Sequence, residues 1–256
     1  MIPRIIPPLT GLTVLVTRPR PQAEALAQGI ASLGGEGIVF PTISIESCAA
    51  TAPHPHDWIM FVSVHAVALG APLIQKTGST RIAAIGKATA SALVAINLTP
   101  DVVPDAPYTS EALLAHPAFQ PTPSDRVLIV RGEGGREMLR ETLQARCAEV
   151  NVLEVYRRVK PALDALEIAS LEERWAAGEI DAVTATSVET YRNLTEILTP
   201  QGLELLNRTT LVAPTSRIVE SAAELGWKAD CLIANSAEDA AILGTLARWQ
   251  ARARSV

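Results

Sequence analysis

A weak internal repeat constrains the fold of this chain more than any other feature. Four segments of the first half each have a similar counterpart in the second half. The pairs, in chain order, are 14–18 with 127–131, 63–67 with 187–191, 81–97 with 210–226, and 110–114 with 237–241. Because the order is kept and the offsets are all roughly 110–130 residues, we expect two similar units that arose by duplication.

Short apolar runs alternate with longer segments of helical periodicity, which is typical of α/β architecture. The expected strands are 13–17, 58–62, 81–85, 126–130, 181–185, 210–213 and 230–234. The clearest helices are 22–33, 137–146, 188–198 and 218–225, with Gly34 and Gly226 placed to end the first and the last. Continuous apolar strands indicate parallel sheets covered on both faces. The sequence therefore predicts two similar doubly wound parallel-sheet domains.

Two extended segments, 38–43 and 151–160, interrupt this alternation at equivalent positions of the repeat. We interpret them as a two-stranded connector between the domains. Domain one would then combine residues 1–37 with 161–256, and domain two would span 44–150. Two sequential domains remain the simpler alternative.

Composition excludes several classes of function. The net charge of −5 argues against a nucleic-acid binder. The three cysteines (Cys48, Cys147 and Cys231) are an odd number, widely spaced, which fits reduced thiols in a cytoplasmic protein. Residues 1–10 do not resemble a signal peptide, and no apolar run reaches the ~18 residues of a membrane span, so we expect no membrane association.

Polar and cationic residues gather in the turns that follow the expected strands, where doubly wound sheets bind ligands. These turns are 17–20, 63–65, 86–89, 131–136, 186–187 and 214–217. Helix N-termini there bind anions, and nearby positive charge would come from Arg18, Arg20, Lys87, Arg131, Arg136 and Arg217. The predicted ligand is polyanionic and large enough to touch both domains.

Each of these residues also has a purely structural interpretation. A serine or threonine at a strand–helix junction is commonly an N-cap. Arg18 and Arg131 could form structural ion pairs, and Gly132–Gly135 could simply permit a tight turn. Recurrence at six turns favours the ligand hypothesis.

The sequence lacks the common motifs for nucleotide binding, metal binding and covalent catalysis. Gly132–Gly135 lacks the spacing of a dinucleotide-binding loop, and Gly86–Ala88 is not a P-loop. His54 and His56 lie in a proline-rich segment that we interpret as a surface loop rather than a metal site. No Ser–His–Asp triad can be assembled. The residues therefore call for no cofactor, metal or covalent nucleophile.

Six short stretches of the chain form an ordered pattern. They are V-L-V-T-R-P at 14–19, F-V-S-V-H-A-V at 61–67, A-I-G-K-A-T-A at 84–90, S-E-A-L-L at 110–114, V-L-I-V-R-G-E-G-G-R-E at 127–137 and E-V-Y-R-R at 154–158. In this pattern the chain resembles the uroporphyrinogen-III synthase family over nearly its full length. Each motif is loose, but their order and spacing together are specific.

The resemblance implies two α/β domains with the active-site cleft between them, and no cofactor. The implied substrate is hydroxymethylbilane, a linear tetrapyrrole with eight carboxylates. Loss of its terminal hydroxyl gives an azafulvene cation, and closure through a spiro intermediate inverts the last pyrrole. Tyr156 matches the family's tyrosine that assists departure of the hydroxyl, although ordinary aromatic packing would also explain it.

The expected substrate contacts combine these motifs with the turns described above. They are Arg18, Ser63, Gly86, Lys87, Thr89, Arg131, Gly132, Arg136, Ser187, Thr215 and Ser216. Some family members repeat the Gly86–Ala90 turn in their second half. Here Thr215 replaces the glycine and Ile218 the threonine, so the carry-over to Thr215 and Ser216 is the least direct.

We expect a monomer that receives its substrate from hydroxymethylbilane synthase. The main alternative is a non-enzymatic tetrapyrrole- or anion-binding regulatory module of the same fold, which would have no need to keep Tyr156 and Arg131. A nucleotide-dependent enzyme is the second alternative, and the failed glycine motifs disfavour it.

Overall fold

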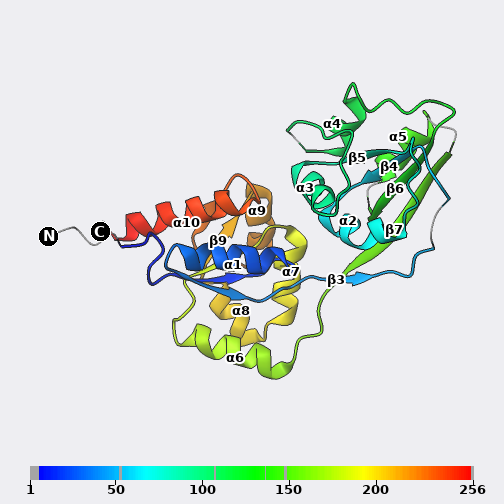
Figure 1. Cartoon of the computed structure of the whole chain (residues 1–256). Helices are drawn as coiled ribbons and strands as arrows, with labels where there is room; N and C mark the ends of the chain where they lie inside the picture. The colour runs from blue at the N-terminus through cyan, green and yellow to red at the C-terminus, as the bar shows by residue number, and fades with distance from the viewer. Residues whose placement is uncertain (1–5, 52–53, 107, 136, 147–148, 255–256) are drawn as a thin grey trace. The chain divides into compact units, whose positions relative to one another are not determined.

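The computed structural model describes residues 6–51, 54–106, 108–135, 137–146 and 149–254 (Figure 1). The chain forms two compact units. Unit one comprises residues 1–44 and 159–256, and unit two comprises residues 45–158. Each unit contains a five-stranded sheet covered by helices, as the α/β prediction requires.

Unit one is built around a sheet with the strand order β10-β9-β8-β1-β2, in which every neighbouring pair is parallel. Its strands are β1 (Thr13–Val16), β2 (Glu36–Val39), β8 (Ala182–Thr184), β9 (Thr210–Ala213) and β10 (Cys231–Ile233). Its helices are α1 (Gln22–Ser32), α6 (Ala165–Ala176), α7 (Val188–Ile197), α8 (Pro200–Leu206), α9 (Ser216–Glu224) and α10 (Asp239–Ala253).

The sheet of unit two has the order β3-β7-β6-β4-β5. Its strands are β3 (Ser44–Ser47), β4 (Trp58–Phe61), β5 (Arg81–Ala84), β6 (Arg126–Gly132) and β7 (Glu149–Val159), and β4, β5, β6 and β7 pair in parallel. The helices are α2 (Val64–Gly70), the short 3-10 turn Ala71–Leu73, α3 (Lys87–Ala95), α4 (Ser110–Ala115) and α5 (Glu137–Gln144).

The strand orders of the two sheets correspond along the sequence repeat. The order β2-β1-β8-β9 in unit one matches the order β7-β6-β4-β5 in unit two. The counterpart of β10 in unit two is a single parallel bridge from Ala83 to Val102. The central strand β1 comes from the beginning of the chain, yet it pairs with β8, about 170 residues later. The sheets therefore share one topology although unit one is assembled from both ends of the chain.

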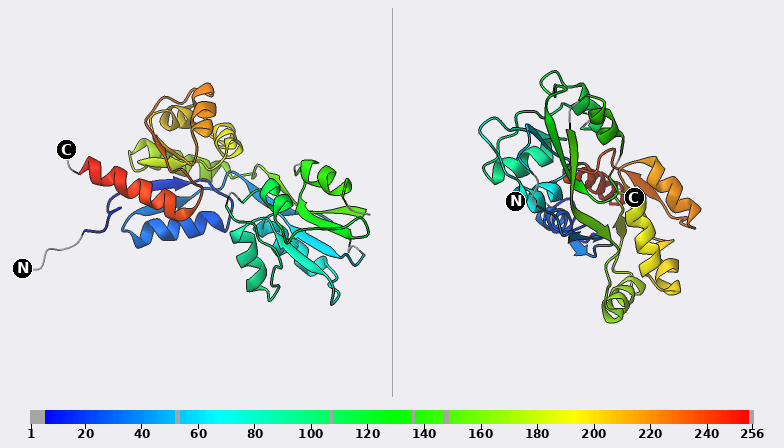
Figure 2. Two further views of the ribbon diagram at one scale, coloured as in Figure 1. Left: turned by 90° about the horizontal axis from the view of Figure 1, so that it is seen from above. Right: turned by 90° about the vertical axis from the view of Figure 1, so that its right-hand side faces the viewer.

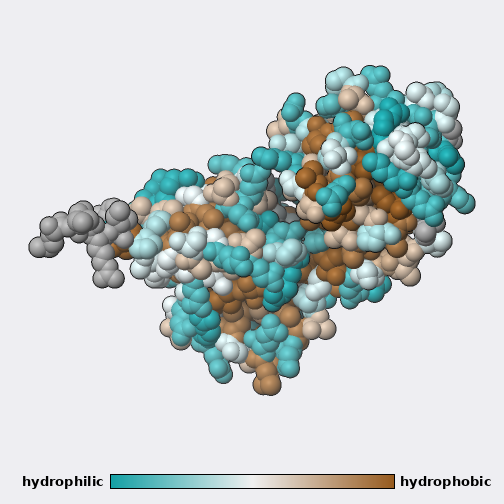
Figure 3. Space-filling model, in the orientation of Figure 1, coloured by the Kyte–Doolittle hydropathy of each residue, from teal (hydrophilic) through white to brown (hydrophobic). Residues whose placement is uncertain are grey.

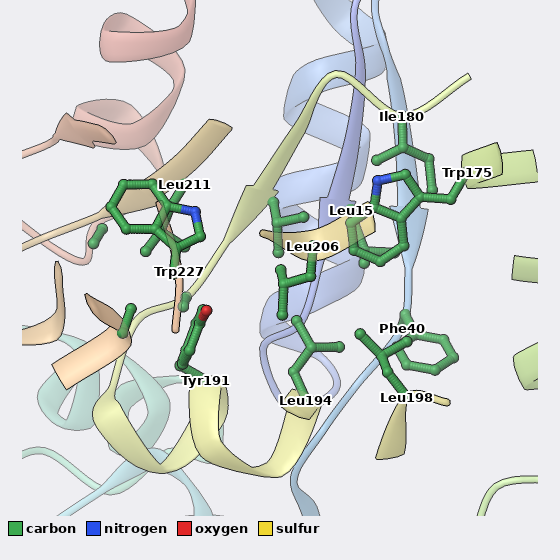
Figure 4. Packing of buried hydrophobic residues seen from close by; sticks show 14 of the residues in the cluster. Leu15, Phe40, Trp175, Ile180, Tyr191, Leu194, Leu198, Leu206, Leu211 and Trp227 are labelled. Atoms are coloured by element: carbon green, nitrogen blue, oxygen red, sulfur yellow. The ribbon is translucent and has the colours of Figure 1, made fainter. Parts of the chain in front are cut away.

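Alternating side chains of each sheet enter two separate apolar layers. On one face of the first sheet, Leu15 packs with Trp175, Tyr191 and Leu194 of the covering helices (Figure 4). On the other face, Val14 and its neighbours pack against α1 and α10, which lie side by side within unit one (Figures 1 and 2).

The surface of both units is mixed on the face drawn in Figure 3, with apolar side chains among hydrophilic ones. Among the described residues, no helix combines the length and apolar character needed to cross a membrane.

The structure confirms every strand and helix expected above to within two or three residues, and Gly34 and Gly226 adopt the positive φ of helix ends. The segment 38–43 overlaps β2, and 151–160 falls largely within β7, so both contribute to the sheets. The segment 54–56 is irregular and His54 is exposed, as expected of a surface loop, but the side chain of His56 departs from that expectation. It is buried, and its Nε2 lies 2.7 Å from Asn151 Oδ1. Cys48 and Cys231 are free thiols, whereas Cys147 lies outside the described residues.

Candidate active site

Three adjacent strands of unit two position Tyr156 at the carboxyl end of β6. Phe61 on β4 pairs with Val130 on β6, and Gly132, the last residue of β6, pairs with Tyr156 on β7. A Cβ atom added to Gly132 would lie 2.6 Å from both Cε2 and Cζ of the Tyr156 ring. The ring therefore lies directly against Gly132 in a space that a side chain would fill. Only 5% of Tyr156 is exposed.

The hydroxyl of Tyr156 lies beside the residue that follows β4. Ser63 caps α2, and its Oγ accepts a hydrogen bond from the Ala66 N–H at 3.0 Å. The same Oγ lies 3.0 Å from the Tyr156 hydroxyl oxygen. The structure therefore brings three predicted site residues, Ser63, Gly132 and Tyr156, into one cluster.

His65 also belongs to this cluster, although it was not among the predicted site residues. Its ring lies edge-on to the Tyr156 ring, with a centroid separation of 5.6 Å. Burial, and then the positive charge of Arg158, lower the pKa of His65 below its ordinary value. The imidazole is therefore neutral at pH 7. Its place within the F-V-S-V-H-A-V stretch was the available sequence signal.

The lowered pKa of His65 predicts acid sensitivity. Below the ordinary pKa of about 6.5 the unfolded chain binds a proton that the folded chain resists, so the free energy of unfolding should decrease as the pH falls from 7 towards 5. Urea denaturation across this range measures the decrease. In His65→Phe the decrease in the free energy of unfolding between pH 7 and pH 5 should be smaller. The same decrease in this variant as in the unaltered protein would contradict the assignment to His65.

Arg131 lies at the same end of β6 and is largely buried within unit two. Its guanidinium donates to Glu154 Oε1 at 3.0 Å, to Glu137 Oε1 at 2.8 Å and to the Gly135 carbonyl at 3.2 Å. The hydrogen bond from Arg131 lowers the pKa of Glu137. These contacts tie the turn Gly132–Gly135, which we call the glycine turn, to β7 and to the first turn of α5. Arg136 lies outside the described residues, so its expected substrate contact stays a prediction.

The turn after β5 presents a helix N-terminus with an exposed cation. Gly86 precedes α3, Lys87 is exposed, and Thr89 is buried. A Cβ added to Gly86 would lie 2.8 Å from Cβ of Tyr108, so this glycine allows the Tyr108 side chain to pack over the turn. Tyr108 itself is 45% exposed. This turn can accept a carboxylate at the amide groups of α3, with Lys87 nearby.

The predicted residues of unit one follow β1, β8 and β9, which end at one edge of their sheet. Ser187 caps α7, with its Oγ 3.1 Å from the Thr190 N and 2.8 Å from Thr190 Oγ1. Thr215 precedes α9 without a capping side-chain bond, and Thr215 and Ser216 are both exposed. Their N–H groups and hydroxyls are thus available to an anion.

The expected cations of unit one differ in their surroundings. The Arg18 side chain is largely buried and forms an ion pair with Asp239 at the start of α10. Arg20 pairs with Glu24, one turn further along the chain. Arg217 is exposed on the first turn of α9. Arg18 therefore links β1 to α10, and its role as a substrate contact stays a prediction.

Known proteins similar to this chain are uroporphyrinogen-III synthases. The model of the family described as uroporphyrinogen-III synthase HemD matches residues 24–243. The uroporphyrinogen-III synthase of Salmonella typhimurium is 35% identical over 251 residues, covering 92% of this chain and 100% of the relative. That of Escherichia coli is 33% identical over 250 residues, again covering 92% and 100%.

Two solved structures share the fold. The uroporphyrinogen-III synthetase of Helicobacter pylori matches with a TM-score of 0.56 at 14% identity, covering 91% of this chain and 96% of the other. A mutant uroporphyrinogen III synthase of Thermus thermophilus matches with a TM-score of 0.51 at 23% identity, covering 95% and 99%.

Proposed function

Because this chain belongs to the uroporphyrinogen-III synthase family, we propose that it closes hydroxymethylbilane to uroporphyrinogen III with inversion of the last pyrrole ring. It is an enzyme of tetrapyrrole and haem biosynthesis, a cyclising lyase. The observation that supports the chemistry best is the Tyr156 hydroxyl, held at the carboxyl end of β6 by Gly132 and Ser63. Ligands of doubly wound sheets bind at this end of the strands.

Tyr156 would act as a proton donor in the first step. The C–O bond of the terminal hydroxymethyl group breaks, and its oxygen leaves as water with the phenol proton. The lone pair of the pyrrole nitrogen supplies the electrons that form the azafulvene cation. The substituted α-carbon of the last pyrrole then attacks the cation to form the spiro intermediate. The bond from that carbon to its original bridging methylene breaks, and the methylene forms a new bond to the unsubstituted α-carbon of the same ring, which inverts the ring. Loss of the hydrogen at that carbon returns a proton to Tyr156. The overall change is the loss of one water.

The remaining predicted residues would hold the substrate carboxylates. The amide groups at the starts of α3, α7 and α9, with Lys87 and Arg217, offer anion sites at the carboxyl ends of the strands in both units. Hydroxymethylbilane closes spontaneously to the non-inverted isomer, so the protein must fix the conformation of the chain more than accelerate bond formation. Multiple weak contacts along the substrate suit that task.

The activity is tested by a coupled assay. Hydroxymethylbilane is generated enzymatically, this protein is added, and the oxidised products are separated by chromatography. We expect mostly the type III isomer. Type I alone, from protein that circular dichroism shows to be folded, would refute the proposal.

Arg131→Ala tests the glycine turn as a carboxylate site. Loss of the contacts to Gly135, Glu137 and Glu154 should loosen the turn and raise KM by about tenfold, the value of one charge-assisted hydrogen bond. The Arg131 side chain is only 9% exposed, whereas both carboxylate partners are more than one-third exposed, so we expect a modest loss of stability. Arg140→Ala, which also removes a partner of Glu137, is the matched control. An unchanged KM would contradict the substrate role of this turn.

The protein would act as a cytoplasmic monomer that takes hydroxymethylbilane directly from hydroxymethylbilane synthase. Widely spaced cysteines support a reducing compartment. Sedimentation of the protein alone and with the synthase tests both the monomer and the handover.

A further inference from the structure

The contact between Ser63 and Tyr156 links two chemically different hydroxyls. Ser63 lies just beyond β4, whereas Tyr156 belongs to β7, and β6 lies between these strands. The tyrosine ring lies against Gly132 of β6, and its oxygen comes to 3.0 Å from Ser63 Oγ. Packing against Gly132 and His65 restrains the ring and so keeps the phenol oxygen beside Ser63.

The hydrogen-bonding capacity of Ser63 determines what it can do for Tyr156. A serine hydroxyl has one hydrogen and two lone pairs, and one lone pair of Ser63 already accepts the Ala66 N–H. If the Tyr156 O–H pointed at Ser63, it could not reach a leaving group. If Ser63 donates instead, the Tyr156 hydrogen is directed elsewhere. The chain Ala66 N–H, Ser63 O–H, Tyr156 O–H is then polarised in a single direction.

We propose that Ser63 is a positioning residue that donates its hydrogen to the Tyr156 oxygen, so that the Tyr156 O–H points at the departing hydroxyl of the substrate. The same bond stabilises the phenolate left after proton transfer. This inference rests on the proposed function. It differs from the direct substrate contact predicted for Ser63, because the hydrogen of Ser63 is used within the protein.

The capping serine of unit one shows that this arrangement is not a general property of the repeat. Ser187 occupies the corresponding position, caps α7 in the same way and lies beside Thr190 Oγ1 rather than a phenol. A serine can therefore cap the helix after this strand without a tyrosine hydroxyl beside it. Among the described residues of unit one, no hydrogen bond from Ser187 to a tyrosine hydroxyl corresponds to the Ser63–Tyr156 pair.

Steady-state kinetics of Ser63→Ala separate positioning from substrate binding. We expect kcat to fall roughly 10- to 100-fold, the value of a hydrogen bond to a charged group, while KM changes less than about twofold. Ser63→Thr keeps the hydroxyl and should recover most of the turnover. Thr109→Ala is the matched control, because Thr109 caps α4 through the Ala112 N–H at 3.2 Å, with no contact to Tyr156. A rise in KM at unchanged kcat would overturn the proposal.

A double-mutant cycle tests whether Ser63 acts through Tyr156. In a Tyr156→Phe background, Ser63→Ala should lower kcat by less than about twofold, since the hydroxyl that it serves is absent. If the fold-decreases in kcat caused by Ser63→Ala and by Tyr156→Phe multiply in the double variant, Ser63 acts independently of Tyr156. The proposal then fails, while the role of Tyr156 stands. If Tyr156→Phe has normal turnover, both assignments fail.

A spectroscopic measurement tests the contact without any assay of activity. The chain contains 3 tyrosines, so protein labelled with carbon-13 at the ring carbon bearing the hydroxyl should give three resolvable signals. Tyr156→Phe identifies the signal of Tyr156. Ser63→Ala should move this signal, whereas Thr109→Ala should not. An unmoved signal in Ser63→Ala would overturn the proposal whatever the kinetics show.

Discussion

Replacement of Tyr156 by phenylalanine is expected to lower kcat about 100-fold, in the range of a lost general acid, while KM stays nearly unchanged. The ring would remain in place, because its packing against Gly132 and His65 does not involve the hydroxyl. Only the proton donor for the departing water is lost. Because spontaneous closure continues, the fraction of type I product should rise as the enzymatic rate falls.

The coupled assay with isomer separation measures both effects. Tyr191→Phe is the matched control: it removes the phenol oxygen of a buried tyrosine in unit one, for which the described residues provide no hydrogen-bond partner. We expect its kinetics to equal those of the unaltered enzyme. Wild-type turnover in Tyr156→Phe would remove this hydroxyl from the mechanism.

Gly132→Ala should disrupt the packing of the candidate site directly. Its Cβ would lie 2.6 Å from two ring carbons of Tyr156, and neither the ring nor the paired strands β6 and β7 can yield without repacking. Overpacking of this kind costs about 1–3 kcal/mol of stability. The ring must also move away from Ser63, so turnover should fall at least as far as in Tyr156→Phe.

Urea denaturation and the isomer assay together measure the outcome. Gly78→Ala provides the control, because no atom lies within 4 Å of the position of its added Cβ. Its stability should change by less than about 0.5 kcal/mol. If Gly132→Ala were as stable and active as Gly78→Ala, the ring would not be held against Gly132 as described.

Most of the fold could be predicted because its signals are local. Apolar runs mark the strands, and capping residues such as Ser63 and Ser187 mark helix starts within a few residues of sequence. The burial of His56 could not be predicted in this way. It depends on Asn151, which lies 95 residues later and reaches His56 only through the pairing of strands.

The candidate site was predictable as a set of turns but not as a set of contacts. The sequence shows that Arg131 ends a strand, but not that Glu154 on the neighbouring strand would neutralise it. Likewise, the need for glycine at position 132 follows from the Tyr156 ring, 24 residues away in sequence and paired with it in the sheet. Such contacts depend on strand register, which residue composition alone does not specify.

Because unit one combines both ends of the chain and unit two is its middle, the strands of the two units become available at different times during synthesis. Residues 45–158 form unit two and are continuous in sequence, so all of its strands and helices are present before the second part of unit one has been made. Strand β1 is made first, but its neighbour β8 follows about 170 residues later, and β9 and β10 come later still. Strand β1 must therefore remain unpaired on that side until about 170 further residues have been made. Prior folding of unit two shortens the loop that has to close, so slow folding of the middle of the chain would delay assembly of both ends.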